Sequence, residues 1–165
     1  MQAGVLGVGS LGFHHARILR QVPGARLAGI YDDDAARLAT VAAELEVRPF
    51  RSRDELLETV DAAVIAVPTT VHAEVALAAI AAGVHLLIEK PIAHTLAEAD
   101  AIVDAANAAG LVVATGHVER FNGALRACEP YLEDPRFIES HRLAPFNPRG
   151  TDVAVVLDLM IHDID

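Results

Sequence analysis

The sequence is poor in cysteine, in aromatic residues and in long apolar runs. Its 165 residues include one cysteine and no tryptophan, and only 4% of them are aromatic. The lone Cys128 excludes an internal disulfide framework and a cysteine-based zinc site, and it suits a reducing compartment. No run reaches the about 18 apolar residues of a membrane-spanning helix, and no basic segment precedes the first apolar run as in a signal peptide. We therefore expect a cytoplasmic protein without a bound metal.

Positive charge is also scarce. Lysine and arginine together number 13 against 23 acidic residues, which gives a net charge of −10. Without a basic cluster to neutralise phosphates, we expect neither a nucleic acid nor an anionic membrane as a partner. The remaining composition, 53% hydrophobic and 22% charged, is that of a globular protein. Its length suffices for one full domain and part of a second.

The stretch AGVLGVGSLG near the N-terminus combines an apolar strand pattern with glycines at G-x-G-x-x-G spacing. Gly7 permits a tight turn, Gly9 leaves room for a pyrophosphate, and Gly12 lets the following helix lie close to the strand. The phosphates would lie at the N-terminus of that helix, beside Ser10 and Leu11, where free N–H groups favour an anion. The alternative is a glycine-rich corner between a strand and a helix that binds nothing.

An acidic residue follows the second apolar strand. Asp32 comes 20 residues after Gly12, where a carboxylate can accept the ribose hydroxyls of a dinucleotide. The same charge repels a 2′-phosphate, and the next arginine is Arg37. The sequence therefore predicts NAD as the cofactor and makes NADP less favoured.

Apolar strand patterns and helix patterns alternate along the first two thirds of the chain. This alternation predicts an α/β fold, a Rossmann-type doubly wound parallel sheet, with a ligand crevice at the carboxyl ends of its strands. The expected strands are 3–8, 26–31, 47–50, 62–67, 85–88 and 111–115, and the expected helices are 11–22, 35–45, a short one opened by a capping box at 52–55, 71–82 and 95–109.

Several polar residues come directly after these strands, where a crevice would lie. Lys90 follows a fully apolar strand and precedes Pro91, which restricts Lys90 to an extended backbone and so directs its side chain. The alternative is a solvated loop lysine. His72, in the first turn of a helix, is either a residue near the nicotinamide or a polar helix residue. His14 and His15 are expected to be structural or solvated.

The last third of the chain has another pattern. It predicts a helix at 119–132, a strand at 137–143, a loop at 144–152 and a final helix from 153 to the end. On a helical wheel Asp158, His162 and Asp165 share a wedge of about 60°, while apolar residues cover most of the rest. We therefore expect a buried helix in which Asp158 orients His162 as a general base. A metal site and a buried salt network are the alternatives.

Six motifs follow one another along the chain: GVGSLG, Asp32, AVPTTVH, EKP, GHVERFN and LDLMIHDID. In this order they resemble the glucose–fructose oxidoreductase, inositol dehydrogenase and MocA (Gfo/Idh/MocA) family. The resemblance implies an NAD(P)-dependent oxidoreductase acting on a sugar or cyclitol hydroxyl. It also implies a Rossmann domain followed by a second α/β domain that often forms an oligomer interface, hence a homo-oligomer at full length. The family's catalytic lysine falls on Lys90 and its Asp–His pair on Asp158 and His162.

Within the family, GHVERFN and residues 135–165 resemble the branch that includes UDP-N-acetylglucosamine 3-dehydrogenases. Members are longer than this chain, so we expect a Rossmann domain at 1–118 and the truncated start of the second domain at 119–165. The fragment should bind NAD with little turnover. The alternatives are a cyclitol or aldose dehydrogenase and a non-catalytic NAD-binding module.

The candidate site residues form three groups. Lys90, Asp158 and His162 are the expected catalytic residues, and whether Lys90 or His162 is the base stays open. The expected cofactor contacts are Gly7, Gly9, Ser10, Leu11, Gly12, Asp32, Pro68, Thr69, His72, Glu89 and Lys90, and the expected substrate contacts are His117, Arg120, Asn122 and Arg149.

Overall fold

A computed structural model describes residues 1–141, 143 and 154–165. The chain consists of two compact units, Met1–Thr115 and Gly116–Asp165.

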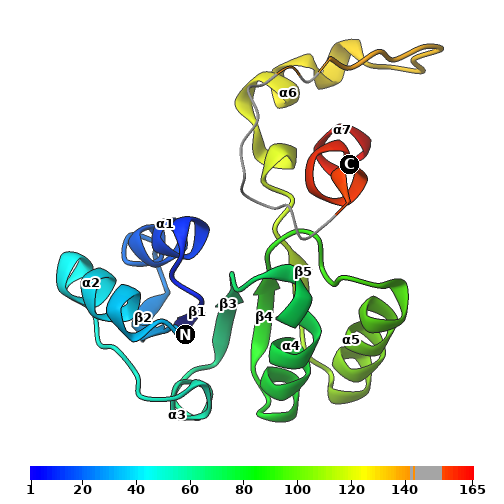
Figure 1. The fold of residues 1–165 in the computed structure, drawn as a ribbon. Helices are drawn as coiled ribbons and strands as arrows, with labels where there is room; N and C mark the ends of the chain where they lie inside the picture. Colours follow the sequence, from blue (N-terminus) through cyan, green and yellow to red (C-terminus); the bar gives the residue numbers. More distant parts are fainter. Residues whose placement is uncertain (142, 144–153) are drawn as a thin grey trace. The chain divides into compact units, whose positions relative to one another are not determined.

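The first unit is built on a five-stranded parallel sheet (Figure 1). The strand order is β2-β1-β3-β4-β5, so β2 lies on one side of β1, and β3, β4 and β5 follow one another on its other side. The carboxyl ends are in register, with Leu6 beside Ile65 and Ile65 beside Ile88. Parallel sheets of this order bind ligands at the reversal point, here between β1 and β3. The strands are β1 (Gln2–Leu6), β2 (Arg26–Tyr31), β3 (Ala62–Ile65), β4 (His85–Ile88) and β5 (Val113–Thr115).

Helices cover both faces of this sheet. Neighbouring residues along each strand point to opposite faces, so each apolar strand contributes side chains to two cores. Val5 and Val64 belong to a core shared with α1 (Ser10–Leu19) and α2 (Ala35–Leu45). Leu6 and Ile65 belong to a second core. The predicted doubly wound Rossmann-type sheet is therefore confirmed. The helices of the second core are α3 (Arg53–Leu57), α4 (His72–Ala81) and α5 (Leu96–Ala109).

The helix starts after Ser52 and Thr95 are confirmed, although only one carries a full capping box. Thr95 accepts the N–H of Glu98, and the Glu98 side chain accepts the N–H of Thr95. Ser52 caps α3 through the N–H of Glu55, but the Glu55 carboxylate accepts instead from Arg48 and the Arg51 backbone. The second box is therefore half formed.

Three predictions of secondary structure are wrong, those for residues 47–50, 119–132 and 137–143. Residues 47–50 form no strand but a single bridge between Ile30 and Pro49, in which the Ile30 N–H donates to the Arg48 carbonyl and the Phe50 N–H donates to the Ile30 carbonyl. The helix expected at 119–132 is split into a 3₁₀ helix at Val118–Phe121, α6 at Gly123–Cys128 and a 3₁₀ helix at Glu129–Tyr131. Asn122 causes the first break, since its side chain caps α6 through the N–H of Ala124.

The strand expected at 137–143 is absent from 137–141 and 143, and the loop expected at 144–152 lies outside the described residues. The final helix exists as a π-helix at Val156–Met160 followed by α7 at Ile161–Ile164. Its predicted burial is wrong, because Met160 is 45% and Ile164 is 69% exposed. Among its described residues the second unit has no strand.

Candidate active site

The loop between β1 and α1 is packed tightly at two glycines and open at the third. A Cβ on Gly7 would lie 2.7 Å from the backbone of Ala66, and Gly7 has a φ of +83°. A Cβ on Gly12 would lie 1.8 Å from the Gly7 carbonyl oxygen, whereas one on Gly9 would meet nothing within 4 Å. Gly9 also precedes α1 without a side-chain cap. The open side of the loop and the helix N-terminus thus offer a place for a pyrophosphate.

Asp32 is fixed against the same loop. One of its carboxylate oxygens accepts the N–H of Val8 at 2.6 Å, and the other accepts the N–H of Asp34 at 2.9 Å. Each carboxylate oxygen keeps a lone pair, so both can still accept ribose hydroxyls. The acid expected beside the adenosine half of a dinucleotide is therefore held in a defined orientation.

Arg37 reaches the glycine loop from the first turn of α2, a contact that sequence reasoning missed. Its Nε donates to the Val8 carbonyl at 2.8 Å and its Nη2 to the Gly9 carbonyl at 3.4 Å. The signal in the sequence was its place three residues after the helix cap Asp34, which turns the side chain back toward the strand end.

Glu89 and Lys90 lie at the carboxyl end of β4, where parallel pairing continues through the Glu89 N–H to the Ile65 carbonyl at 2.9 Å. Glu89 is 7% exposed. One of its oxygens contacts His15 Nε2 at 2.6 Å, and the other accepts the Lys90 N–H at 3.3 Å. The peptide bond from Lys90 to Pro91 is cis.

The electrostatics of Glu89 follow from these neighbours. Burial raises the pKa of the Glu89 carboxyl, but the hydrogen bond and charge of His15, with the backbone and charge of Lys90, lower it further than burial raises it. The net pKa lies below its ordinary value. Glu89 is therefore an anion at neutral pH and can only accept hydrogen bonds, so His15 Nε2 must be the donor. His15 thus makes a structural contact, one of the two alternatives expected for it, but the sequence did not indicate Glu89 as its partner.

His72 is 1% exposed and lies in the interior of the first unit. Its Nδ1 is 2.9 Å from the Pro91 carbonyl oxygen and its Nε2 is 2.9 Å from that of Val67. Both ring nitrogens thus lie against protein carbonyl oxygens, and the expected contact with the nicotinamide stays a prediction. Pro68, which is exposed, and Thr69, which is half-buried, form the start of the 3₁₀ turn between β3 and α4.

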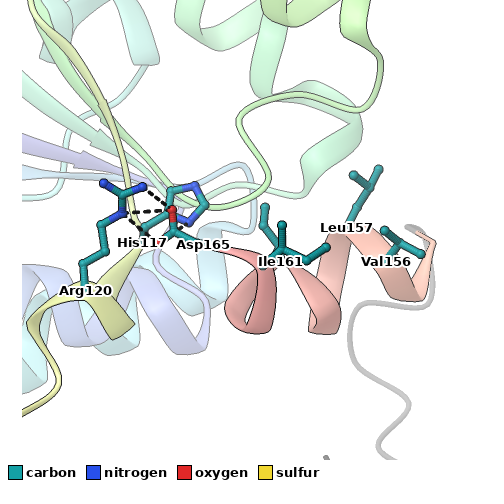
Figure 2. Close-up of a pocket in the computed structure, with 7 residues that line it drawn as sticks. His117, Arg120, Val156, Leu157, Ile161 and Asp165 are labelled. Carbon is teal, nitrogen blue, oxygen red and sulfur yellow. Dashed lines mark hydrogen bonds and ion pairs between the residues drawn. The ribbon is translucent and has the colours of Figure 1, made fainter. Parts of the chain in front are cut away.

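In the second unit Asp165 contacts two of the expected substrate residues, His117 and Arg120 (Figure 2). Its carboxylate accepts from Arg120 Nε and Nη2 at distances between 2.6 and 2.9 Å, and it lies 3.4 Å from His117 Nδ1. The hydrogen bond from Arg120 lowers the pKa of Asp165 and raises that of Arg120. These residues line a cavity of about 360 Å³ together with Val156, Leu157, Ile161 and Ile164.

The other expected site residues of the second unit are Asp158, His162, Asn122 and Arg149. Asp158 and His162 are half-buried and four residues apart, Asp158 in the π-helix and His162 in α7. Asn122 is engaged as a helix cap and by Glu119 at 2.8 Å. Arg149 lies outside the described residues.

The residues that the structure describes contain no group of three or more histidine, cysteine, aspartate or glutamate side chains arranged to hold a metal ion. None of their helices is long and apolar enough to cross a membrane.

Comparison with curated proteins gives a UDP-N-acetylglucosamine 3-dehydrogenase of Acidithiobacillus ferrooxidans, 47% identical over the whole of this chain and 52% of its own length. Inositol 2-dehydrogenase 2 of Saccharopolyspora erythraea is 35% identical, again over the whole chain and 52% of its own length. The chain thus spans about half the length of the curated relatives that it matches.

Solved structures agree with this. The A. ferrooxidans UDP-N-acetylglucosamine 3-dehydrogenase superposes with a TM-score of 0.92 over 99% of this chain and 54% of that one. GenD2 from gentamicin A biosynthesis, solved in complex with NAD, is 30% identical and gives a TM-score of 0.75 over 81% of this chain and 39% of that one.

Residues 1–117 match the family described as an oxidoreductase family with an NAD-binding Rossmann fold. The expected family resemblance and the expected NAD cofactor are confirmed at the level of that family. The chain belongs to the Gfo/Idh/MocA family of oxidoreductases, whose NAD-binding fold its first unit carries.

Proposed function

We propose that this chain is part of an NAD-dependent dehydrogenase that oxidises a secondary hydroxyl of a UDP-N-acetylhexosamine, at the 3-position of the sugar. The observation that carries the proposal is the 47% identity to a UDP-N-acetylglucosamine 3-dehydrogenase along the whole chain, against 35% for an inositol dehydrogenase over the same span. We place the incomplete substrate domain after the Rossmann domain, at 119–165.

The geometry of the first unit fits the cofactor. The open space at Gly9 and the N-terminus of α1 would hold the pyrophosphate, and the fixed Asp32 carboxylate would accept the hydroxyls of the adenosine ribose. Bound there, NAD supplies hydride acceptance. This place at Gly9, the N-terminus of α1 and Asp32 is the proposed cofactor seat. It would be bordered by the exposed residues Ser10, Leu11 and Pro68 and by the half-buried Thr69.

Proton transfer falls to the residues that the family resemblance indicates. Lys90 would donate a hydrogen bond to the reacting hydroxyl oxygen and stabilise its negative charge. His162 would accept the proton, with Asp158 holding its tautomer. His117 and Arg120, gathered by Asp165, are proposed to contact the diphosphate or acetamido group, because Arg120 keeps donors beyond the two that Asp165 engages.

The first test measures binding and turnover separately. Calorimetry should show that the 165-residue chain binds NAD more tightly than NADP. A form extended to the length of its relatives should produce NADH from NAD and UDP-N-acetylglucosamine, while Lys90→Ala should retain NAD affinity and lose turnover.

The substrate controls decide between the proposal and its rivals. NADH formation with myo-inositol alone would replace the proposal by a cyclitol dehydrogenase. Tight NAD binding without turnover of either substrate or of simple aldoses would indicate a non-catalytic NAD-binding module. A cytoplasmic location and a homo-oligomer at full length complete the proposal, and sedimentation of the extended form tests the latter.

A further inference from the structure

We propose that His15 and His72 act as a clamp on the turn Glu89-Lys90-Pro91 and are positioning residues for Lys90. Each imidazole binds a neighbour of Lys90 in the chain, His15 on the preceding residue and His72 on the following one. The role in catalysis rests on the proposed function, through the assignment of Lys90. The clamp itself is a statement about geometry and has its own test.

The first half of the clamp runs from α1 to the backbone of Lys90. His15 Nε2 donates to one oxygen of Glu89 at 2.6 Å, and the other oxygen accepts the Lys90 N–H. The side chains of His15 and Glu89 are only 20% and 9% exposed, so little water competes for this contact. Hydrogen bonds to an ionised carboxylate are about twice as strong as neutral ones. Glu89 is thus held in one place and fixes the amide of the next residue.

The second half runs from α4 to the other side of Lys90. His72 lies between the carbonyl oxygens of Pro91 and Val67, each 2.9 Å from a ring nitrogen. Because carbonyl oxygens only accept hydrogen bonds, each contact requires an N–H on the ring. An imidazole with both protons satisfies both carbonyls, and a neutral one satisfies one of them. The ring thus lies between the segment after β3 and the segment after β4, within hydrogen-bond distance of a carbonyl in each.

The two halves approach the turn from opposite faces of the sheet. Helix α1 packs on the face with Val5, and α4 packs on the face with Leu6. A turn bound from one side can still pivot, whereas one bound from both layers keeps its direction. Helix α1 also begins at the glycine loop, so one rigid element carries both the proposed cofactor seat and the support of Lys90. The clamp gives a role to both imidazoles, the half-buried His15 and the buried His72.

The direct test is amide hydrogen exchange on the 165-residue chain. His15→Phe removes the donor and keeps the ring volume, and His72→Phe does the same on the other side. Each should speed exchange at residues 89–93 by about tenfold, the effect of losing one hydrogen bond to a charged or buried group, while β1 exchanges as before. His15→Gln, whose amide can donate from a position like Nε2, should restore protection. His14→Phe, on the exposed side of the same helix, is the control.

Turnover in the extended form gives the second measurement. Each Phe variant should lower kcat by about tenfold or more and change the dissociation constant of NAD by less than about threefold, with recovery in His15→Gln. If His72→Phe does not fold, His72→Gln replaces it, because its amide can donate from a position like Nε2 toward Val67 and leaves the Pro91 carbonyl without the Nδ1 contact.

The outcomes separate the clamp from the proposed function. Absence of turnover in the unmodified extended protein contradicts the proposed function and leaves the exchange test intact. Unchanged exchange at residues 89–93 in both Phe variants overturns the clamp. A uniform increase across the sheet overturns it too, because it would show two residues that only stabilise the fold.

Discussion

Alanine at Gly9 and alanine at Gly12 should separate cofactor binding from folding. The Cβ added at Gly9 enters open space, whereas the one at Gly12 would lie 1.8 Å from a backbone oxygen. Gly9 has a φ of −60°, which alanine tolerates, and it precedes α1 as the cap. Lower entropy of the unfolded chain favours Gly9→Ala by about 0.5 kcal/mol, and loss of a better cap residue opposes it by a similar amount. Its free energy of unfolding should therefore change by less than about 1 kcal/mol.

The binding effect of Gly9→Ala should be much larger. A methyl group placed where the pyrophosphate must lie costs about 1 to 3 kcal/mol, the range for forced close contacts, which weakens NAD binding about 5- to 150-fold. Gly12→Ala should instead lose about 3 kcal/mol of stability, because backbone must move, and its melting temperature should fall by about 10 °C.

Calorimetric titration with NAD and thermal unfolding of both variants measure the two effects. Gly123→Ala is the matched control, since a Cβ there also meets nothing within 4 Å but lies at the start of α6. It should leave NAD affinity unchanged. If Gly9→Ala binds NAD as tightly as the unmodified chain, the pyrophosphate does not lie against Gly9 and the proposed cofactor seat is wrong.

Two further predictions concern charge. Asp32→Ser removes the anion beside the glycine loop and leaves Arg37 there. The affinity for NADP relative to NAD should then rise about tenfold, because like charges about 4 Å apart repel by up to about 4 kcal/mol at an effective dielectric constant near 20. Titration with both cofactors measures this ratio. The pKa of Glu89 is lowered in the folded state, so its ionised form stabilises the protein above the ordinary value of 4.5, and this stability is lost as the pH falls through the lower folded value. Urea unfolding should therefore show the largest deficit of Glu89→Gln near neutral pH and a shrinking one in acid; a deficit that grows in acid would contradict the assignment.

The first unit was predictable because its signals are local. Each of the five strands is an apolar segment bounded by turn residues, and helix starts such as Thr95 are fixed by residues only three positions apart. The prediction at 47–50 failed because an apolar pattern does not show whether neighbouring backbone groups can pair. There the Arg48 carbonyl and the Phe50 N–H pair with Ile30 of β2, and the pairing stops at this one bridge.

The candidate site was predictable only in part, because its supporting contacts are not local. The glycine spacing and Asp32 follow from the chain itself, but nothing near His15 shows that Glu89 will lie beside it. The same holds for Arg120 and Asp165, 45 residues apart. The final helix was expected to be buried because its residues are apolar, yet burial depends on what covers a helix.

The contact between His15 and Glu89 also has a kinetic consequence. The two residues are 74 positions apart, so the contact must wait until β1, β3 and β4 are assembled. The β1-α1-β2 segment, by contrast, closes over a short length of chain. During folding we therefore expect the glycine loop to be ordered before the turn that carries Lys90, so that a chain stalled at this stage would hold a cofactor seat without a positioned lysine.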